Sequence, residues 1–90
     1  MKEALTLSSQ HVARSRQEPG CLAHSVYEDR DVEGRLVFVE EWESEQALYR
    51  HFAVPESGEF AAALAALAAE RPTIRLYKAS ELPFPGKRAT

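Results

Sequence analysis

The stretch covering residues 36–52 constrains the fold most, because its hydrophobic periodicity changes partway along. Residues 36–42 (Leu-Val-Phe-Val-Glu-Glu-Trp) are rich in β-branched and aromatic side chains, which is typical of a β-strand. From Ser44 onward the apolar residues recur at three- and four-residue spacing, which is typical of an α-helix. The Ser44 hydroxyl can cap that helix, and Glu45 places negative charge at the positive end of its dipole. The sequence therefore predicts a strand that leads directly into a helix over residues 44–53.

Side-chain alternation along this strand predicts a candidate site on one of its faces. Successive side chains of a strand point to opposite faces, so one face carries Leu36, Phe38, Glu40 and Trp42, and the other carries Val37, Val39 and Glu41. Glu40 thus shares a face with two aromatic rings, and the following helix brings His51 within reach of them. Two interpretations of Glu40 stay open: a hydrogen bond to a histidine, or an ion pair with Arg35 or Arg75.

Length and charge exclude several classes of protein. Ninety residues form one domain with a small core, so dimerisation is an expected way to bury more apolar surface. The formal net charge of -3, with Lys and Arg scattered along the chain, provides no basic surface for nucleic acid. No apolar run approaches the roughly 20 residues of a membrane span, and no signal-peptide pattern is present. We therefore expect a cytoplasmic homodimer with neither a nucleic-acid nor a membrane partner.

The spacing of cysteine and histidine gives no sign of a metal centre. Cys21 is the only cysteine, which excludes an internal disulfide, and we interpret it as a small buried hydrophobe. His11, His24 and His51 are far apart in the sequence, and no Cys-x-x-Cys motif accompanies them. The sequence therefore predicts no metal ligands.

The N-terminal half predicts a helix followed by a β-hairpin. Residues 2–16 place apolar side chains near one helical stripe, and the Glu18-Pro19-Gly20 sequence ends that helix. Alternation then predicts a strand over residues 21–28, and the polar residues 29–34 form the hairpin loop.

The register of this hairpin decides which side chains of its first strand meet Glu40. In one register His24 faces Glu40 and Val26 lies on the same face; a shift by one residue brings Tyr27 and Ser25 there instead. The sequence leaves both registers open.

The C-terminal half predicts a further helix, a last strand and a tail. Pro55 interrupts the helical pattern, and a helix follows with Ser57 as a candidate cap and an Ala- and Leu-rich body over residues 60–69, which we expect to be core. Residues 73–78 alternate as a strand. We expect residues 1–79 to form the domain and residues 80–90, with two prolines, to form a tail.

An ordered set of short segments resembles the antibiotic biosynthesis monooxygenase (ABM) family, including its small quinol monooxygenases. The segments are Glu18-Pro19-Gly20-Cys21-Leu22, Phe38-Val39-Glu40-Glu41-Trp42-Glu43-Ser44, Ala47-Leu48 and His51-Phe52. The resemblance implies an α+β, ferredoxin-like antiparallel sheet with helices on one face, paired in a dimeric barrel. It also implies a cavity between sheet and helices in each subunit.

The chain departs from the family pattern in ways that bear on function. Family members usually begin with a strand before the first helix, and this chain starts almost inside that helix, so the expected central strand has no counterpart in these residues. Two interpretations stay open: the given start is late, or the partner subunit or a rearranged last strand fills the gap. His24 stands where the family often has an aromatic residue, and Glu56 replaces a common histidine. The haem-degrading relatives use an Asn that this chain lacks, and Leu64 aligns with their helical His. These differences argue against haem chemistry.

The resemblance implies a cofactor-independent monooxygenase that oxidises a small aromatic quinol or phenol with molecular oxygen. In this interpretation His51 and His24 are the candidate acid–base residues, because an imidazole titrates near neutral pH. The candidate substrate-binding residues are Trp42, Phe38, Glu40, Phe52, Phe60 and Tyr77. Two alternatives remain: a non-catalytic dimeric module that binds a small molecule, and an isomerase-type enzyme that uses the same cavity.

Overall fold

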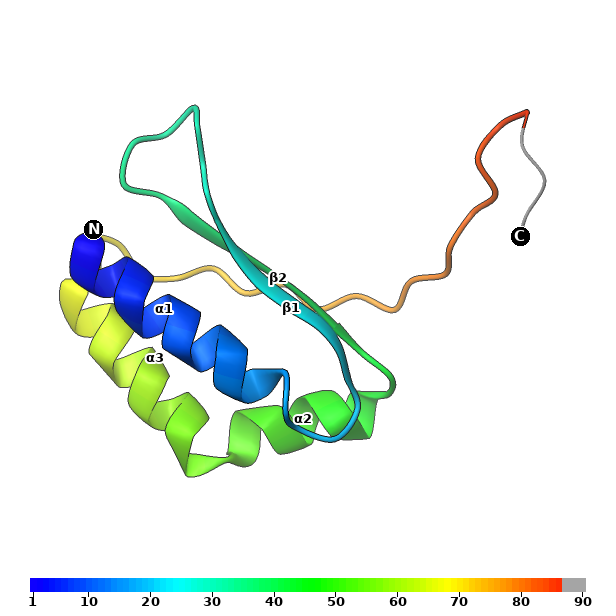
Figure 1. Cartoon of the computed structure of the whole chain (residues 1–90), viewed down its shortest axis with the longest axis horizontal. Coiled ribbons are helices and arrows are strands. Elements are labelled where there is room, and N and C mark those ends of the chain that lie inside the picture. Colours follow the sequence, from blue (N-terminus) through cyan, green and yellow to red (C-terminus); the bar gives the residue numbers. More distant parts are fainter. Residues whose placement is uncertain (87–90) are drawn as a thin grey trace.

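The computed structural model describes residues 1–86, which form an α+β fold with three helices and a two-stranded antiparallel sheet. The elements in chain order are α1 (Lys2–Ser15), β1 (Cys21–Glu28), β2 (Leu36–Trp42), α2 (Glu45–Ala53) and α3 (Pro55–Leu67). Helices α1 and α3 lie side by side against the hairpin, and α2 connects the end of β2 to α3 (Figure 1). The predicted helix–hairpin–helix–helix order is confirmed.

The hairpin adopts the register in which His24 faces Glu40. These two residues are Cα partners across the β1–β2 ladder, and Val26 pairs with Phe38 in the same way. The register is irregular between Cys21 and Ala23, and Leu22, at this bulge, is 64% exposed. The structure thus excludes the alternative register and directs the imidazole of His24 to the inner face of the hairpin.

Gly20 fixes the approach of α2 to the start of β1. Its φ of 85° lies in the left-handed region, which glycine adopts without steric cost. A Cβ on Gly20 would lie 2.5 Å from Cβ of Ala47, a residue buried in the first turn of α2. The Gly20 carbonyl also accepts a 2.8 Å hydrogen bond from the Glu43 backbone N–H. The turn therefore packs against α2 at a distance that only glycine allows.

The caps of α2 and α3 differ in how well the sequence predicts them. Ser44 caps α2 as predicted, because its hydroxyl accepts a 3.1 Å hydrogen bond from the Ala47 backbone N–H. The predicted cap at Ser57 is wrong: α3 begins at Pro55, with Val54 at the N-cap position and no side-chain cap. Proline suits the first position of a helix, because its missing N–H would have no partner there.

The buried interior is small and mostly polar. Val12 and Ala47 are the buried hydrophobic residues of the described chain, whereas the buried polar residues are Ser8, His11, Ser15, His24, His51 and Ser57. The prediction that α3 forms core is wrong for this single chain, because Ser57 is its one buried residue and Leu67 is 46% exposed. A single copy thus buries little apolar surface.

The predicted strand over residues 73–78 is wrong. These residues are extended and exposed, without ladder pairing, and Ile74 and Tyr77 are 71% and 79% exposed. Alternation alone does not make a strand, because strand backbone groups need a neighbouring strand to pair with, and the described residues include no strand before α1.

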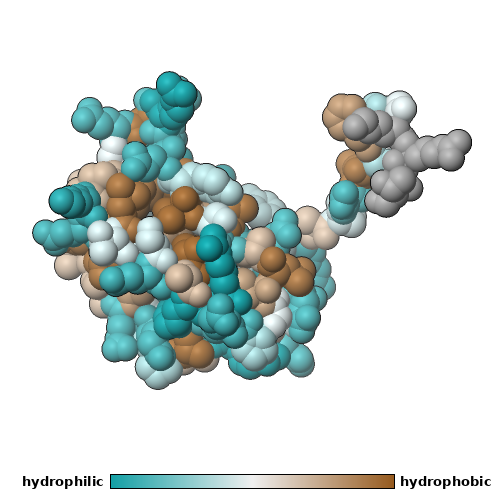
Figure 2. Space-filling model, viewed as in Figure 1, coloured by the Kyte–Doolittle hydropathy of each residue, from teal (hydrophilic) through white to brown (hydrophobic). Residues whose placement is uncertain are grey.

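The segment that follows α3 passes the hairpin and extends away from the body (Figures 1 and 2). It raises the radius of gyration to 15.0 Å, against about 12 Å for a compact chain of this length. Residues 80–86 are exposed and carry neither helix nor strand; the rest of the predicted tail, residues 87–90, lies outside the described residues.

Candidate functional site

The three histidines of the chain converge in one buried cluster. Helix α1 contributes His11, β1 contributes His24 and α2 contributes His51, and their exposed fractions are only 7%, 1% and 3%. Their ring centroids form a nearly equilateral triangle, with separations of 5.3 Å from His11 to each of the others and 5.6 Å between His24 and His51. We call these three side chains the histidine cluster.

Aromatic rings enclose the histidine cluster. Phe60 of α3 stacks on His11 at a centroid distance of 4.0 Å and an interplanar angle of 4°. The ring centroid of Trp42, on β2, lies 4.7 Å from that of His51, and the ring centroid of Phe38 lies 6.4 Å from that of His24. The cluster therefore sits in surroundings with few competing water molecules, where each polar contact is stronger than at the surface.

Glu18 orients His51. Its Oε1 lies 2.8 Å from Nδ1 of His51, and its Oε2 accepts a 2.9 Å hydrogen bond from Arg14. An ionised carboxylate only accepts hydrogen bonds, so Nδ1–H of His51 donates to Glu18. In the neutral imidazole this contact leaves the lone pair on Nε2, which faces Glu40 at 3.8 Å.

Burial and the charge of Arg14 together keep His11 in its neutral form. Nη2 of the Arg14 guanidinium lies 2.6 Å from Nδ1 of His11, and because arginine has no acceptor, His11 accepts this hydrogen bond. Burial, followed by the positive charge of Arg14, lowers the pKa of His11 from 6.5 to about 4. The remaining proton of His11 therefore lies on Nε2, which is 3.5 Å from the Ser15 hydroxyl.

Glu40 lies between two of the imidazoles. One of its oxygens accepts a 3.0 Å hydrogen bond from the Trp42 indole, and the other lies 3.3 Å from Nε2 of His24. Burial alone would raise the pKa of Glu40, but its contacts with His24 and Trp42 and its attraction to His51 outweigh this effect and lower the pKa. Glu40 is therefore ionised at neutral pH.

His24 lacks aligned hydrogen-bond partners. Its distance of 3.3 Å to Glu40 allows electrostatic attraction, but the geometry is not that of a hydrogen bond. Both ring nitrogens are buried without a hydrogen-bond partner among the described residues. Such groups are rare in folded proteins, because an unpaired buried polar atom costs about 1–3 kcal/mol.

The structure brings most of the sequence-predicted site residues together. The residues in the cluster or its enclosing shell are His24, His51, Trp42, Phe38, Glu40 and Phe60. Phe52 lies at the margin, with its ring 5.7 Å from His51 and 43% of the residue exposed. Tyr77 lies outside the cluster, on the exposed segment after α3.

Sequence reasoning missed three members of the site: His11, Arg14 and Glu18. They recur at spacings of three and four along the end of α1 and the turn after it, which places them on one side of the helix. A spacing of three and four residues is visible in the sequence and indicates one side of a helix. The buried face of α1 follows this spacing and also holds Ser8, Val12 and Ser15.

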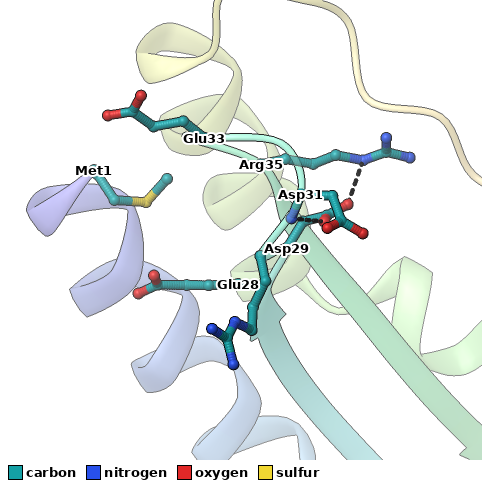
Figure 3. A pocket seen from close by; sticks show the side chains of 8 residues that line it. Met1, Glu28, Asp29, Asp31, Glu33 and Arg35 are labelled. Carbon is teal, nitrogen blue, oxygen red and sulfur yellow. Dashed lines mark hydrogen bonds and ion pairs between the residues drawn. The ribbon is translucent and has the colours of Figure 1, made fainter.

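Two surface hollows lie away from the histidine cluster. The larger, about 580 Å³, is formed by the hairpin loop and Met1 (Figure 3). Within it Asp29 accepts a 2.8 Å hydrogen bond from the Asp31 backbone N–H and lies 3.7 Å from Arg35. The smaller hollow lies along the first turns of α1. Neither hollow is lined by a sequence-predicted site residue.

Among the described residues, no helix is long and apolar enough to cross a bilayer.

Comparison with protein families gives a match over most of the chain. A family model described as antibiotic biosynthesis monooxygenase matches residues 1–70. An uncharacterized protein of Synechocystis sp. is 36% identical over 80 residues, which cover 89% of this chain and 54% of the relative. The chain thus spans about half the length of the curated relative it matches.

Solved structures share this fold. A crystal structure described as an antibiotic biosynthesis monooxygenase is 31% identical, with a TM-score of 0.80 over 89% of this chain and 84% of that one. Rv0793 from Mycobacterium tuberculosis is 28% identical, with a TM-score of 0.68 over 89% of each chain. A conserved protein from Methanosarcina mazei Go1 is 23% identical, with a TM-score of 0.83 over 88% of this chain and 78% of that one. At this identity the similarity shows the fold alone. These matches confirm the ferredoxin-like α+β class.

Proposed function

Because this chain belongs to the antibiotic biosynthesis monooxygenase family, we propose that it oxidises a small aromatic quinol or phenol with molecular oxygen and without a metal or flavin. The observation that carries this proposal is the partly buried contact of 2.8 Å between Glu18 and His51. It holds an imidazole in the tautomer that can accept a proton from a phenolic hydroxyl.

The reaction needs no external reductant, because the substrate supplies the electrons. A phenol loses its hydroxyl proton to the enzyme, and the resulting anion transfers one electron to O₂. Recombination of the substrate radical with superoxide forms a carbon–oxygen bond at a ring carbon. Loss of water then leaves a quinone, so a ring C–H becomes C=O, one oxygen atom of O₂ enters the product and the other leaves as water.

His51 is the proposed base. Its Nε2 takes the substrate proton, and the imidazolium that forms lies between two carboxylates, Glu18 at 2.8 Å and Glu40 at 3.8 Å. Both carboxylates stabilise the positive charge where it develops, which lowers the barrier to proton transfer. His24, whose Nε2 lies 3.3 Å from Glu40, is the second candidate base.

The substrate ring would pack against Trp42 and Phe52. Both lie against His51, and Phe52 is 43% exposed, so this side of the cluster borders the protein surface. Planar aromatic side chains provide the apolar contact area that an aromatic substrate needs. Exclusion of water by these rings would protect the radical pair from side reactions.

We also propose that the working form is a homodimer. A single chain buries little apolar surface, and the outer face of the hairpin exposes apolar side chains: Tyr27 is 55% exposed, Val37 38% and Val39 51%. A second copy packed on this face would bury them. We place the protein in the cytoplasm, where the free thiol of Cys21 would stay reduced.

A second candidate function is a non-catalytic module that binds a small aromatic molecule. The observation that favours it is the low exposure of the three imidazoles, between 1% and 7%, beneath their aromatic shell. In such a module Trp42 and Phe52 would bind the ligand, and the histidine cluster would only pack the interior of the protein, without a chemical role.

Oxygen uptake with a panel of quinols and phenols distinguishes the two functions. We expect substrate-dependent uptake by the wild-type protein and its loss in His51→Ala, with a smaller loss in His24→Ala. Arg50→Gln is the matched control, because Arg50 precedes His51 on α2 but is exposed. Binding of the same compounds without oxygen uptake would reject the enzyme and favour the module.

A further inference from the structure

We propose that the histidine cluster and Glu40 form a binding site for a divalent transition-metal ion such as Zn²⁺. One ring nitrogen from each of His11, His24 and His51 lies within 4.8 Å of the other two, and all three residues are buried. Imidazole suits zinc, copper, iron and nickel, whereas Mg²⁺ and Ca²⁺ prefer oxygen ligands. The chemistry of the donors therefore selects the class of ion.

The spacing of the donors fits an ion after a small adjustment. Ligand atoms at about 2.0–2.1 Å from a tetrahedral zinc lie roughly 3.4 Å apart. Nε2 of His24 is 3.3 Å from one Glu40 oxygen, and Nε2 of His51 is 3.8 Å from the other. The ligand nitrogens of the three imidazoles, within 4.8 Å of one another, would have to close by up to about 1.4 Å to reach this spacing.

Two features of the surrounding residues favour an ion. Both nitrogens of His24 are buried without an aligned hydrogen-bond partner, and coordination would give one of them a partner. Glu18 accepts a hydrogen bond from Nδ1 of His51, which is the contact that carboxylates commonly make with metal-binding histidines. It leaves the lone pair on Nε2, which faces Glu40 at 3.8 Å.

Arg14 disfavours metal binding by His11. Its guanidinium donates to Nδ1 of His11, so His11 can join the site only if Arg14 releases it and keeps its other contact, with Glu18. Arg14 also places a positive charge beside the cluster. We therefore infer that His24, His51 and Glu40 bind the ion first and that Arg14 limits its affinity.

Titration of metal-free protein with Zn²⁺ and Co²⁺ tests this site, with Mg²⁺ as the hard-cation control. We expect one Zn²⁺ per chain and a visible Co²⁺ spectrum of tetrahedral coordination. Glu18→Gln should weaken Zn²⁺ binding about 10–100-fold, His24→Gln should weaken it further, and Arg14→Gln should strengthen it.

Glu40→Gln and Glu41→Gln form a matched pair that keeps the test decisive if His24→Gln does not fold. Glu41 follows Glu40 in β2 but points to the outer, exposed face. We expect only Glu40→Gln to weaken Zn²⁺ binding. Equal affinity of these two variants, or a wild-type protein that binds neither Zn²⁺ nor Co²⁺, would overturn the proposal.

This inference does not rest on the proposed function, because binding is measured without turnover. The two are linked in one respect: a metal ion would occupy the Nε2 lone pair that the proposed base needs. Zn²⁺ should therefore inhibit oxygen uptake. Zinc binding without any oxygen uptake would reject the enzyme alone, and uptake without zinc binding would reject the metal site alone.

Discussion

Substitution of Gly20 by alanine tests the packing that positions α2 and, with it, His51. The added Cβ would lie 2.5 Å from Cβ of Ala47, and alanine would have to adopt a φ of 85°. The left-handed conformation costs about 1–2 kcal/mol for a residue with a Cβ, and overpacking costs about 1–3 kcal/mol. We expect Gly20→Ala to lower the free energy of unfolding by about 2–5 kcal/mol.

Urea and thermal unfolding followed by circular dichroism measure this effect. For a domain of this size 1 kcal/mol shifts the melting temperature by about 4–8 °C, so the loss should exceed about 8 °C. Gly58→Ala is the matched control, because Gly58 lies within α3 and a Cβ there meets nothing within 4 Å. It should raise stability by about 0.5–1 kcal/mol. A Gly20→Ala variant within 0.5 kcal/mol of wild type would refute the reasoning.

Two further predictions concern the polar contacts of the site. Glu18→Gln replaces a charged hydrogen-bond acceptor by a neutral one, which costs about 1–2 kcal/mol. We therefore expect kcat for quinol oxidation to fall about tenfold, whereas the exposed control Glu41→Gln should keep the wild-type rate. Equal rates of the two variants would remove Glu18 from the mechanism. Because the pKa of His11 falls from 6.5 to about 4 on folding, the unfolded chain binds the extra proton and stability should be lost as pH falls through that window. After allowance for solvent screening we expect a loss of about 2 kcal/mol, measured by urea unfolding at pH 7 and pH 4; an equal loss in His11→Gln would assign it to other groups.

Local sequence patterns predicted the parts of the fold that depend on neighbours in the chain. The change of periodicity after Trp42 and the cap at Ser44 are both local signals, and both are confirmed. The hairpin was predicted by alternation and turn residues, but alternation encodes neither its register nor the bulge between Cys21 and Ala23.

The site was only partly predictable, because its members meet through packing rather than through spacing. His24 and His51 were found because they border an aromatic strand, whereas His11 was missed because apolar residues alone defined the buried stripe of α1. The buried face of α1 is instead largely polar, with Ser8 and Ser15 beside His11. The absence of a spacing motif therefore did not exclude a cluster of metal-ligating side chains.

For the exposed segment after α3, the sequence pattern predicted a strand that the structure does not contain. Its alternation is as regular as that of β1, yet it forms no strand, because hydrogen bonding requires a partner strand that the described residues do not provide. Periodicity predicts which face of a strand is apolar, but pairing depends on the rest of the sheet.

The fate of the oxygen atoms tests the central functional claim most directly. The protein is incubated with a quinol or phenol that it consumes, under O₂ enriched in the heavy isotope of oxygen, and the product is analysed by mass spectrometry. We predict that one labelled oxygen atom enters each product molecule and that His51→Ala abolishes this incorporation. A product without label, formed at the wild-type rate, would contradict a monooxygenase and indicate simple oxidation or isomerisation instead.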